Sequence, residues 1–421
     1  MYYTALRPYT LKRLEEIGRA DILVGIPAYN NERTIAHVIQ MVSHGLDKYY
    51  KEHKNVIMIA DGGSTDDTRE MVKEFQLKPW QEKLLSIYRG PGGKGTAFRS
   101  IFEAAVRLDV KACIVVDSDI RSITSDWVQH LLSPVLEKGY QYVTPVYCRH
   151  KYDGTITNNI VYNLTRALYG RRIRQPIGGD FAFSREVAAY YIDQPVWDTE
   201  IARFGIDIWM TTQAVVQGFK ICQANLGVKV HDAKDPAAHL GPMFRQVVWT
   251  IFYLMEQNES YWKKTKKSTP VETFGAEKCS EPEPIKVDLD GLIYNFQVGF
   301  KQFKSFWKDI LDSDSYSDLK KASKMSAKDF SLPVETWVRI LYELAATFHY
   351  WPMNRNKLVD LMTPLYYARV ASFVRETWDM DSSKAEEIVE KNAEAFEQQK
   401  GYLLKMWDKK RKVYEKLSER V

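Results

Sequence analysis

The chain has 421 residues, of which 45% are hydrophobic and 13% aromatic. At this length two domains are expected, and the aromatic share indicates folded packing throughout. The formal net charge of +5 is too small to favour nucleic acid as a partner.

Predicted strands alternate with predicted helices between residues 21 and 116. Each strand is a short run rich in Val, Ile or Leu that ends in polar or glycine-containing residues. Such alternation is typical of right-handed crossovers and a mostly parallel sheet, and therefore of an α/β fold. Thr65 or Asp66 would cap the second helix. The strands are predicted over residues 21–30, 56–61, 84–88 and 112–116, and the helices over 30–42, 69–75 and 96–108.

The fourth strand ends in Asp117-Ser118-Asp119. Side chains alternate along a strand, so the two carboxylates would point the same way and repel each other unless a cation lies near them. Mg²⁺ or Mn²⁺ would suit such a pair. An isolated Asp-x-Asp is more often a solvated turn, but Asp61 and Lys94 also follow predicted strands. Ligands bind at the carboxyl edge of a parallel sheet, so this convergence predicts an active site there.

The order of these motifs resembles that of nucleotide-sugar glycosyltransferases with the GT-A fold. The motifs are PAYNNE at 27–32, DGGSTDDT at 61–68, GKG at 93–95 and DSD at 117–119. Three later segments are similar to the retaining enzymes that make glucosylglycerate, glucosyl-3-phosphoglycerate and mannosylglycerate, and residues 234–246 resemble the glucosyl branch most closely. The resemblance covers residues 20–255. The three segments are 175–186, 204–209 and 225–231.

The resemblance implies a role for each motif. Asp119 and His231 would hold the Mg²⁺ or Mn²⁺ cofactor, while Lys94, Asp180 and Asp207 would act in catalysis. Lys94 would meet the diphosphate or the acceptor's carboxylate in a glycine loop that allows close approach of the backbone. The nucleotide sugar would contact Pro27, Ala28, Asn30, Glu32, Asp61, Lys94, Asp117, Ser118, Gly178, Gly179 and Arg245.

Several of these residues also have ordinary structural interpretations. Asp61 could be a turn residue, and Asp207 a helix N-terminal acid. The glycines before Asp180 would let backbone pass under the sugar, but relatives usually have Glu where this chain has the shorter Asp180. Arg245 and His239 are expected in a loop that folds over the diphosphate as a lid.

Acceptor contacts are expected after the predicted strand at 142–147. Arg149, Asp153 and Thr157 have spacing similar to the acceptor-binding segment of mannosylglycerate synthases, and arginine can bind a carboxylate through two hydrogen bonds. Further cations in this region would either bind a phosphate of the acceptor or form a solvated surface. Both D-glycerate and 3-phosphoglycerate therefore stay open as the small carboxylate acceptor. These cations are His150, Lys151, Arg171, Arg172 and Arg174.

Transfer would retain the donor's α-configuration. No protein nucleophile on the reacting face is evident, although Asp180 and Asp207 stay open as one. The resemblance implies attack from the leaving-group face, with the diphosphate taking the acceptor's proton. Such a reaction depends mainly on positioning and charge stabilisation.

Composition changes after the catalytic part. Residues 1–262 are predicted to form the GT-A domain, residues 263–288 a linker, and residues 289–421 an all-helical domain that could also form a homodimer. The linker opens with the basic run 263–267, interpreted as solvated, with contact to an anionic membrane as the alternative. An aromatic spacing typical of a buried helix face begins at Leu289.

The remaining features favour a cytoplasmic protein. Cys113, Cys148, Cys222 and Cys279 are widely spaced without a CxxC pair. Because Cys113 and Cys222 lie in apolar strand patterns, buried free thiols are favoured over disulfides. The N-terminus lacks a signal-sequence pattern, and the longest apolar stretch, 247–255, is too short to span a membrane.

The leading interpretation is a metal-dependent retaining hexosyltransferase that makes a glucosylglycerate-type compatible solute or its phosphorylated precursor. The alternatives are a mannosylglycerate synthase, a lipid-phosphate sugar transferase of the same fold, and a non-catalytic scaffold that binds sugar nucleotides. Intact Lys94, Asp119 and His231 argue against the scaffold.

Overall fold

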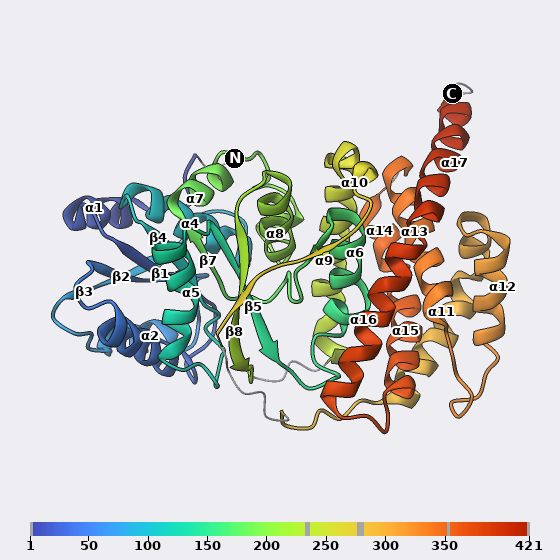
Figure 1. Ribbon diagram of the computed structural model, residues 1–421, viewed down its shortest axis with the longest axis horizontal. Helices are drawn as coiled ribbons and strands as arrows, with labels where there is room; N and C mark the ends of the chain where they lie inside the picture. Colours follow the sequence, from blue (N-terminus) through green and yellow to red (C-terminus); the bar gives the residue numbers. More distant parts are fainter. Residues whose placement is uncertain (1–2, 232–235, 276–281, 352–353, 419–421) are drawn as a thin grey trace. The chain divides into compact units, whose positions relative to one another are not determined.

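The computed structural model in Figure 1 describes residues 3–231, 236–275, 282–351 and 354–418. The chain folds into two compact units, each built from three segments. Unit 1 contains residues 1–148, 173–235 and 270–282; unit 2 contains residues 149–172, 236–269 and 283–421.

Among the described residues of unit 1, eight strands form one sheet in the order β10-β8-β5-β7-β4-β1-β2-β3. All pairings in it are parallel except those of β7, which runs antiparallel to both β4 and β5. The predicted mostly parallel α/β sheet is therefore confirmed. The strands are β1 (Ile22–Ala28), β2 (Asn55–Asp61), β3 (Gln81–Ile87), β4 (Ala112–Val115), β5 (Tyr142–Cys148), β7 (Phe181–Ser184), β8 (Ile221–Val228) and β10 (Thr273–Phe274).

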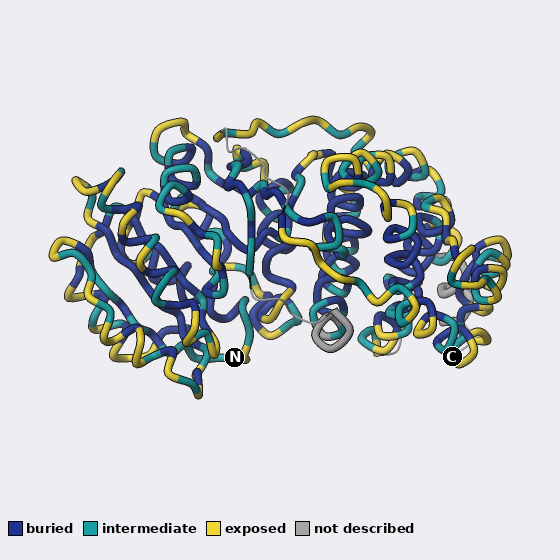
Figure 2. The backbone as a smooth tube through the Cα atoms, turned by 90° about the horizontal axis from the view of Figure 1, so that it is seen from below, coloured by how far each residue is buried: buried dark blue, intermediate teal, exposed yellow. Residues whose placement is uncertain are grey.

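The sheet is buried on both faces, as its nearly continuous apolar strands require. All seven residues of β2 are buried, and Figure 2 shows the central strands as dark, buried tube. Ile22, Val24 and Ile26 of β1 pack with α2 and α5. Gly25 points the other way, and a Cβ there would lie 2.5 Å from Ile101 of α4. The helices of unit 1 are α1 (Pro8–Ile17), α2 (Ile35–Tyr49), α3 (Thr68–Glu74), α4 (Lys94–Arg107), α5 (Asp126–Lys138), α7 (Arg185–Ile192), α8 (Ile206–Val216) and the 3₁₀ turn η2 (Glu200–Ala202).

Two local predictions change in the structure. Strand β4 ends at Val115, so Asp117 and Asp119 lie beyond it and strand alternation does not set their directions. Asp67 occupies the N-cap position of α3 without a side-chain cap, whereas Asp66 accepts a hydrogen bond from the Thr68 N–H at 3.1 Å. Cys113 and Cys222 are buried free thiols, as predicted, whereas Cys148 is disulfide-bonded, which the sequence did not indicate.

Unit 2 is helical, which confirms the predicted helical region after residue 289. Its first segment is held by buried polar groups: the Arg166 guanidinium, 1% exposed, pairs with Glu390 at 2.7 Å, and Trp337 Nε1 donates to the Asn159 carbonyl at 2.8 Å. No described helix has the length and apolar character needed to cross a membrane. The helices are η1 (a π-helix, Thr157–Val161), α6 (Tyr162–Tyr169), α9 (Pro236–Gln257), α10 (Glu259–Lys264), α11 (Leu289–Ile310), α12 (Ser313–Ala322), α13 (Val334–Tyr350), α14 (Arg355–Asp360), α15 (Thr363–Glu376), α16 (Ser382–Gln398) and α17 (Lys400–Ser418).

The units are not divided as the sequence suggested. Residues 149–172 and 236–262, predicted in the catalytic domain, pack with the C-terminal helices because their own helices need a partner for their buried faces. The predicted linker contains the end of α10, strand β9 (Thr269–Pro270) and strand β10, which joins the sheet beside β8. Residues 263–275 are thus ordered parts of the fold.

Candidate active site

The turns after β1, β2 and β4 meet at the carboxyl edge of the sheet. Gly62 N–H donates to the Ala28 carbonyl at 2.8 Å, and Asn30 N–H donates to Ser64 Oγ at 3.0 Å. Ser118 Oγ donates to Asn31 Oδ1 at 2.8 Å. Motifs up to 87 residues apart are therefore locked together, as the parallel topology predicted.

The Asp61 carboxylate holds the turn that follows β2. It is fully buried and accepts hydrogen bonds from Gly63 N–H at 2.9 Å and from Ser64 N–H at 3.1 Å and Oγ at 2.5 Å. These bonds match the turn interpretation, and contact with the base stays a prediction.

Asn30 and Glu32, predicted to contact the nucleotide, are also used within the fold. Asn30 has a positive φ of 54° and its Oδ1 accepts from Thr65 N–H at 2.8 Å. Glu32 Oε2 accepts from Asp67 N–H at 3.1 Å, while Glu32 N–H donates to Asp66 Oδ2 at 3.1 Å. Pro27 and Ala28 form the end of β1, paired with Ala60 and Asp61.

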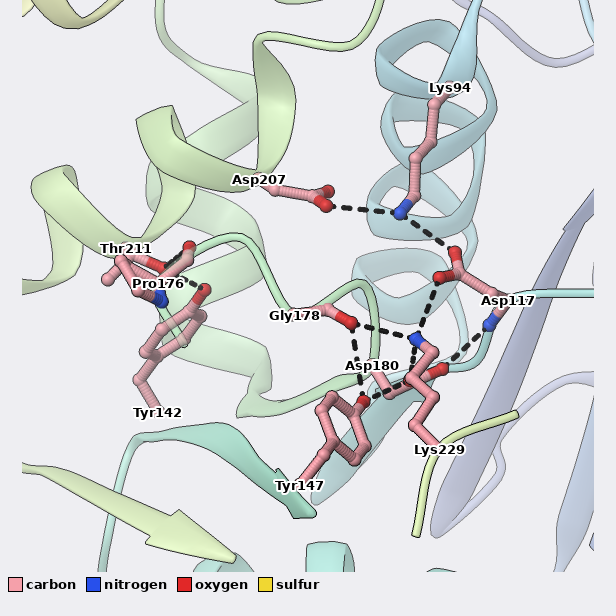
Figure 3. Close-up of polar contacts among 10 residues, drawn as sticks. All are labelled: Lys94, Asp117, Tyr142, Tyr147, Pro176, Gly178, Asp180, Asp207, Thr211 and Lys229. Carbon is pink, nitrogen blue, oxygen red and sulfur yellow. Dashed lines mark hydrogen bonds and ion pairs between the residues drawn. The ribbon is translucent and has the colours of Figure 1, made fainter. Parts of the chain in front are cut away.

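Lys94 is the first residue of α4 and lies between two carboxylates (Figure 3). Its Nζ is 2.8 Å from Asp117 Oδ1 and 3.1 Å from Asp207 Oδ2. Burial alone would lower the pKa of Lys94, but Asp117 and Asp207 outweigh it and raise the pKa above its usual value. Lys94 is therefore a fixed positive charge in the site.

The glycine loop before α4 accommodates another part of the protein backbone. Gly95 N–H donates to the Arg203 carbonyl at 3.0 Å, and a Cβ at Gly95 would lie 2.1 Å from Ile201 O. Gly93, with φ 155°, leaves room for the Ala202 carbonyl in the same way. The glycines therefore fix the segment that leads into α8. From the sequence they were expected only to allow close approach of the backbone to phosphate.

Lys229 completes the site and was missed by the sequence analysis. It follows β8, and its Nζ lies 3.3 Å from Asp117 Oδ2, 2.8 Å from Asp180 Oδ2 and 2.9 Å from the Gly178 carbonyl. Figure 3 shows Asp117 held between Lys94 and Lys229. The available signal was a lysine within the apolar strand pattern that precedes His231, because a buried lysine requires a carboxylate partner.

Asp180 has no exposed surface and all its contacts are within the protein. Its Oδ1 accepts from Asp117 N–H at 2.8 Å, and its Oδ2 accepts from Lys229 and from the Tyr147 hydroxyl. Burial raises the pKa of Asp180, and Lys229 partly opposes that rise. The structure gives Asp180 a positioning role, and direct contact with sugar stays a prediction.

Gly178 and Gly179 allow the chain to pass close to two neighbours. A Cβ at Gly179, where φ is 92°, would lie 2.0 Å from Asp117 Oδ2. A Cβ at Gly178 would lie 2.1 Å from Pro145 Cγ in β5. Both positions therefore require glycine for the packing of Asp117 and β5, whether or not sugar also passes there.

Asp207 is the second residue of α8 and has one oxygen still available. Its Oδ2 pairs with Lys94, whereas its buried Oδ1 has no hydrogen-bond partner among the described residues. Burial raises the pKa of Asp207; Lys94 opposes this rise and the nearby Asp117 adds to it. The site thus contains a buried acceptor oxygen beside a fixed cation.

Asp119 and His231 lie on two backbone segments that run side by side. Ile120 and His231 form an antiparallel bridge, and Arg121 N–H donates to the Val230 carbonyl at 2.9 Å. The described residues contain no group of three or more His, Cys, Asp or Glu side chains arranged for a metal. A carboxylate and an imidazole fit a divalent ion that takes its other ligands from a diphosphate.

The predicted acceptor residues meet in unit 2. Arg149 Nε lies 3.8 Å from Asp153 Oδ2, and a Cβ at Gly154 would lie 3.1 Å from Arg149 Nη1 and 3.7 Å from Thr157 Oγ1. Thr157 begins the π-helix η1, a distortion often found at functional sites. Arg149 therefore contacts Asp153, and Arg149 and Thr157 lie beside one glycine.

Two of the other predicted cations, Lys151 and His150, have structural roles. Lys151 Nζ donates to the carbonyls of Thr377, Trp378 and Met380 after α15, so it does not remain for an acceptor phosphate. His150 is buried, and its Nδ1 accepts from Tyr152 N–H at 3.3 Å.

The predicted lid differs from expectation. Helix α9 already begins at Pro236, so Arg245 is helical rather than part of a loop, and it pairs with Asp360 of unit 2. His239 is in the same helix, but its side chain lies outside the described part of the chain. Contact of Arg245 with a diphosphate stays a prediction.

Comparison with known proteins finds a family model that matches part of the chain. Residues 23–189 match the family described as Glycosyl transferase family 2. The glycosyltransferase AglJ of Haloferax volcanii is 26% identical over 200 residues, which cover 46% of this chain and 58% of AglJ. An uncharacterized protein of Methanocaldococcus jannaschii is 30% identical over 128 residues, which cover 30% of this chain and 47% of that protein. The chain spans only about half the length of these curated relatives.

Solved structures of glucosyl-3-phosphoglycerate synthase from Mycobacterium tuberculosis are also similar. The complex with Mn²⁺, uridine diphosphate and phosphoglyceric acid is 27% identical with a TM-score of 0.44, covering 60% of this chain and 84% of that one. The complex with Mg²⁺ and uridine diphosphate is 25% identical with a TM-score of 0.43, covering 60% and 85%.

Proposed function

We propose that this chain, whose residues 23–189 form a glycosyl transferase family 2 domain, is a metal-dependent retaining hexosyltransferase. The donor is a nucleotide diphosphate sugar, with glucose preferred to mannose, and the acceptor is D-glycerate or 3-phosphoglycerate. The product is a glucosylglycerate-type solute or its phosphorylated precursor.

The observation that carries this proposal is the cluster of Lys94, Asp117 and Asp207 at the carboxyl edge of the sheet. Lys94 offers a charge for the diphosphate, because a buried cation acts strongly on anions in a site of low dielectric. Asp207 Oδ1 is a buried acceptor without a partner among the described residues, which suits a sugar hydroxyl. Donor binding would let Lys94 exchange part of its carboxylate contact for phosphate oxygens.

Asp119 and His231 would hold Mg²⁺ or Mn²⁺. Bound there, the ion would supply charge stabilisation to the departing nucleotide diphosphate. The bridge between Ile120 and His231 supports this assignment, because it fixes the backbone of both ligands side by side.

Retention is proposed to occur without a protein nucleophile. Both oxygens of Asp180 are engaged by Asp117, Lys229 and Tyr147, which argues against Asp180 in that role. The acceptor would attack from the leaving-group face, with Arg149 binding its carboxylate through two hydrogen bonds. A cytoplasmic location and a homodimer through the helical region stay predictions.

The test is nucleotide release from UDP-, GDP- and ADP-glucose and GDP-mannose. Each donor is mixed with Mn²⁺ or Mg²⁺ and either D-glycerate or 3-phosphoglycerate. Turnover with one acceptor, lost with EDTA and in Asp119→Ala and His231→Ala, would support the proposal. The exposed Asp198→Ala variant is the control and should keep full activity.

Folded protein that turns over none of these mixtures would overturn the glycerate assignment. Donor binding without turnover would then point to another acceptor, such as a lipid phosphate. Absence of donor binding would overturn the transferase proposal itself.

A further inference from the structure

The basic run at 263–267 does not behave as a linker. Lys263 and Lys264 end helix α10, and the chain then continues through Lys266 and Lys267 into strand β9. Strand β9 pairs with β6 (Arg171–Arg172) in a separate two-stranded sheet. The tertiary structure therefore places two arginines beside a lysine run about 95 residues later in the chain.

The two segments are in close contact. Thr269 N–H donates to the Gly170 carbonyl at 3.0 Å, and a Cβ at Gly170 would lie 2.9 Å from Lys267 O. Arg171 Nη1 donates to Thr269 Oγ1 at 3.2 Å, and Arg172 Nε donates to Ser268 Oγ at 3.0 Å. The guanidinium groups are thus oriented by neutral hydroxyls, and neither pairs with a carboxylate among the described residues.

Five side chains form this basic patch: Arg171, Arg172, Lys264, Lys266 and Lys267. All five are exposed, and none forms an ion pair with a carboxylate among the described residues. The neighbouring Lys263 forms ion pairs with Glu259 at 2.5 Å and with Asp408 at 3.6 Å. Local carboxylates therefore do not neutralise the five cations of the patch.

We propose that the basic patch is a docking surface for an anionic lipid bilayer. Clusters of four to eight Lys and Arg bind acidic headgroups, because the negative surface potential of anionic lipids attracts each cation. Since no described helix crosses a membrane, the contact would be peripheral and electrostatic. This membrane contact goes beyond the proposed transferase activity. A small water-soluble acceptor does not require the transfer reaction to take place at a membrane.

The character of the patch favours lipid over other polyanions. None of the exposed large hydrophobic residues lies in 169–172 or 261–270. A protein partner usually needs buried aromatic or apolar anchors, and single-stranded nucleic acid is usually held by stacking on aromatic rings. A patch made only of charged side chains suits a mobile layer of phosphate groups.

The test is cosedimentation of the full chain with vesicles in 50 mM and 500 mM NaCl. One set is phosphatidylcholine alone, and the other contains about 30% phosphatidylserine, in the range where acidic lipid attracts basic clusters. We expect binding only to the anionic vesicles at low salt. Because each cation contributes to the attraction, Arg171→Gln/Arg172→Gln/Lys266→Gln/Lys267→Gln should lower partitioning roughly tenfold or more.

The matched control is Lys301→Gln/Lys304→Gln/Lys320→Gln/Lys324→Gln, which removes the same charge from exposed positions on or near α11 and α12. It should lower partitioning less than about threefold, a small loss of the kind expected from net charge alone. Thermal melts of both variants check folding. Equal losses in the two variants, binding to neutral vesicles, or tighter binding to duplex DNA than to anionic vesicles would each overturn the proposal.

Discussion

Lys229 and Asp180 form an ion pair of 2.8 Å in the interior of unit 1, where the side chain of Asp180 has no exposed surface and that of Lys229 is 3% exposed. The same lysine reaches Asp117, which Lys94 contacts from the opposite side. Two lysines thus balance most of the charge of three carboxylates, and each charge depends on its neighbours. Removal of one partner would leave a buried charge without compensation.

Lys229→Met should lower the free energy of unfolding by about 3–5 kcal/mol, the usual loss when one partner of a buried pair is removed. The control is Lys111→Met, because Lys111 pairs with Asp21 at 2.9 Å but is 63% exposed. That exposed pair should contribute at most about 1 kcal/mol. Urea unfolding measures both variants, and similar losses in the two would contradict the buried network.

Gly95→Ala should disturb the approach between α4 and the segment before α8. The new Cβ would lie 2.1 Å from Ile201 O, so we expect a loss of about 1–3 kcal/mol from overpacking and lower transferase activity through displacement of Asp207. Gly92→Ala is the control, since nothing lies within 4 Å of its Cβ. Unfolding curves and turnover are compared. Normal stability and activity in Gly95→Ala would show that the backbone contact is unimportant.

Asp207→Asn should reduce transfer while leaving nucleoside diphosphate binding nearly unchanged. A hydrogen bond to a charged group contributes about 1.5–3 kcal/mol, so kcat/KM should fall roughly 10- to 150-fold. Burial raises the pKa of Asp207, so its active ionised form is lost at a higher pH than for an exposed aspartate. The wild-type rate should decline as pH falls through that raised pKa, and the variant should lack this decline.

The exposed Asp198→Asn variant is the control for Asp207 and should keep both its rate and its acid decline. The measurements are the pH profile of kcat/KM and the Kd for the nucleotide by calorimetry. An equal loss of nucleotide binding and transfer would place Asp207 on the nucleotide instead of the sugar.

Asp61→Asn separates turn stabilisation from base recognition. The carboxylate accepts from Gly63 and Ser64, and the amide nitrogen of Asn would face one of these donors, at a cost of about 1–3 kcal/mol in unfolding free energy. Asp67→Asn, in the same turn but without a side-chain cap bond, should change stability by less than about 0.5 kcal/mol. A change in preference between uridine and guanosine donors, with stability intact, would instead assign Asp61 to the base.

Much of unit 1 could be predicted because its information is local. Apolar runs of strand length end in Asp61 or just before Asp117, and parallel strands place such ends at one edge. Strand β7 was missed, because its four residues resemble any short apolar segment and only its antiparallel pairing with β4 and β5 defines it. The predicted domain boundary was wrong for a similar reason. Nothing in the sequence of residues 149–172 indicates which distant helices they pack against.

The sequence by itself determined the α/β alternation, the helical C-terminal region, and the group of polar motifs at the carboxyl edge of the sheet, since strand direction and side-chain pattern are local properties. Only the tertiary structure decided that Lys229 joins Asp117 and Asp180, and that Arg171 lies beside Ser268 and Thr269. Lys229 follows β8 and Asp117 follows β4, and β5 and β7 lie between these strands. An ion pair across that distance depends on sheet order and register, which no stretch of neighbouring residues encodes.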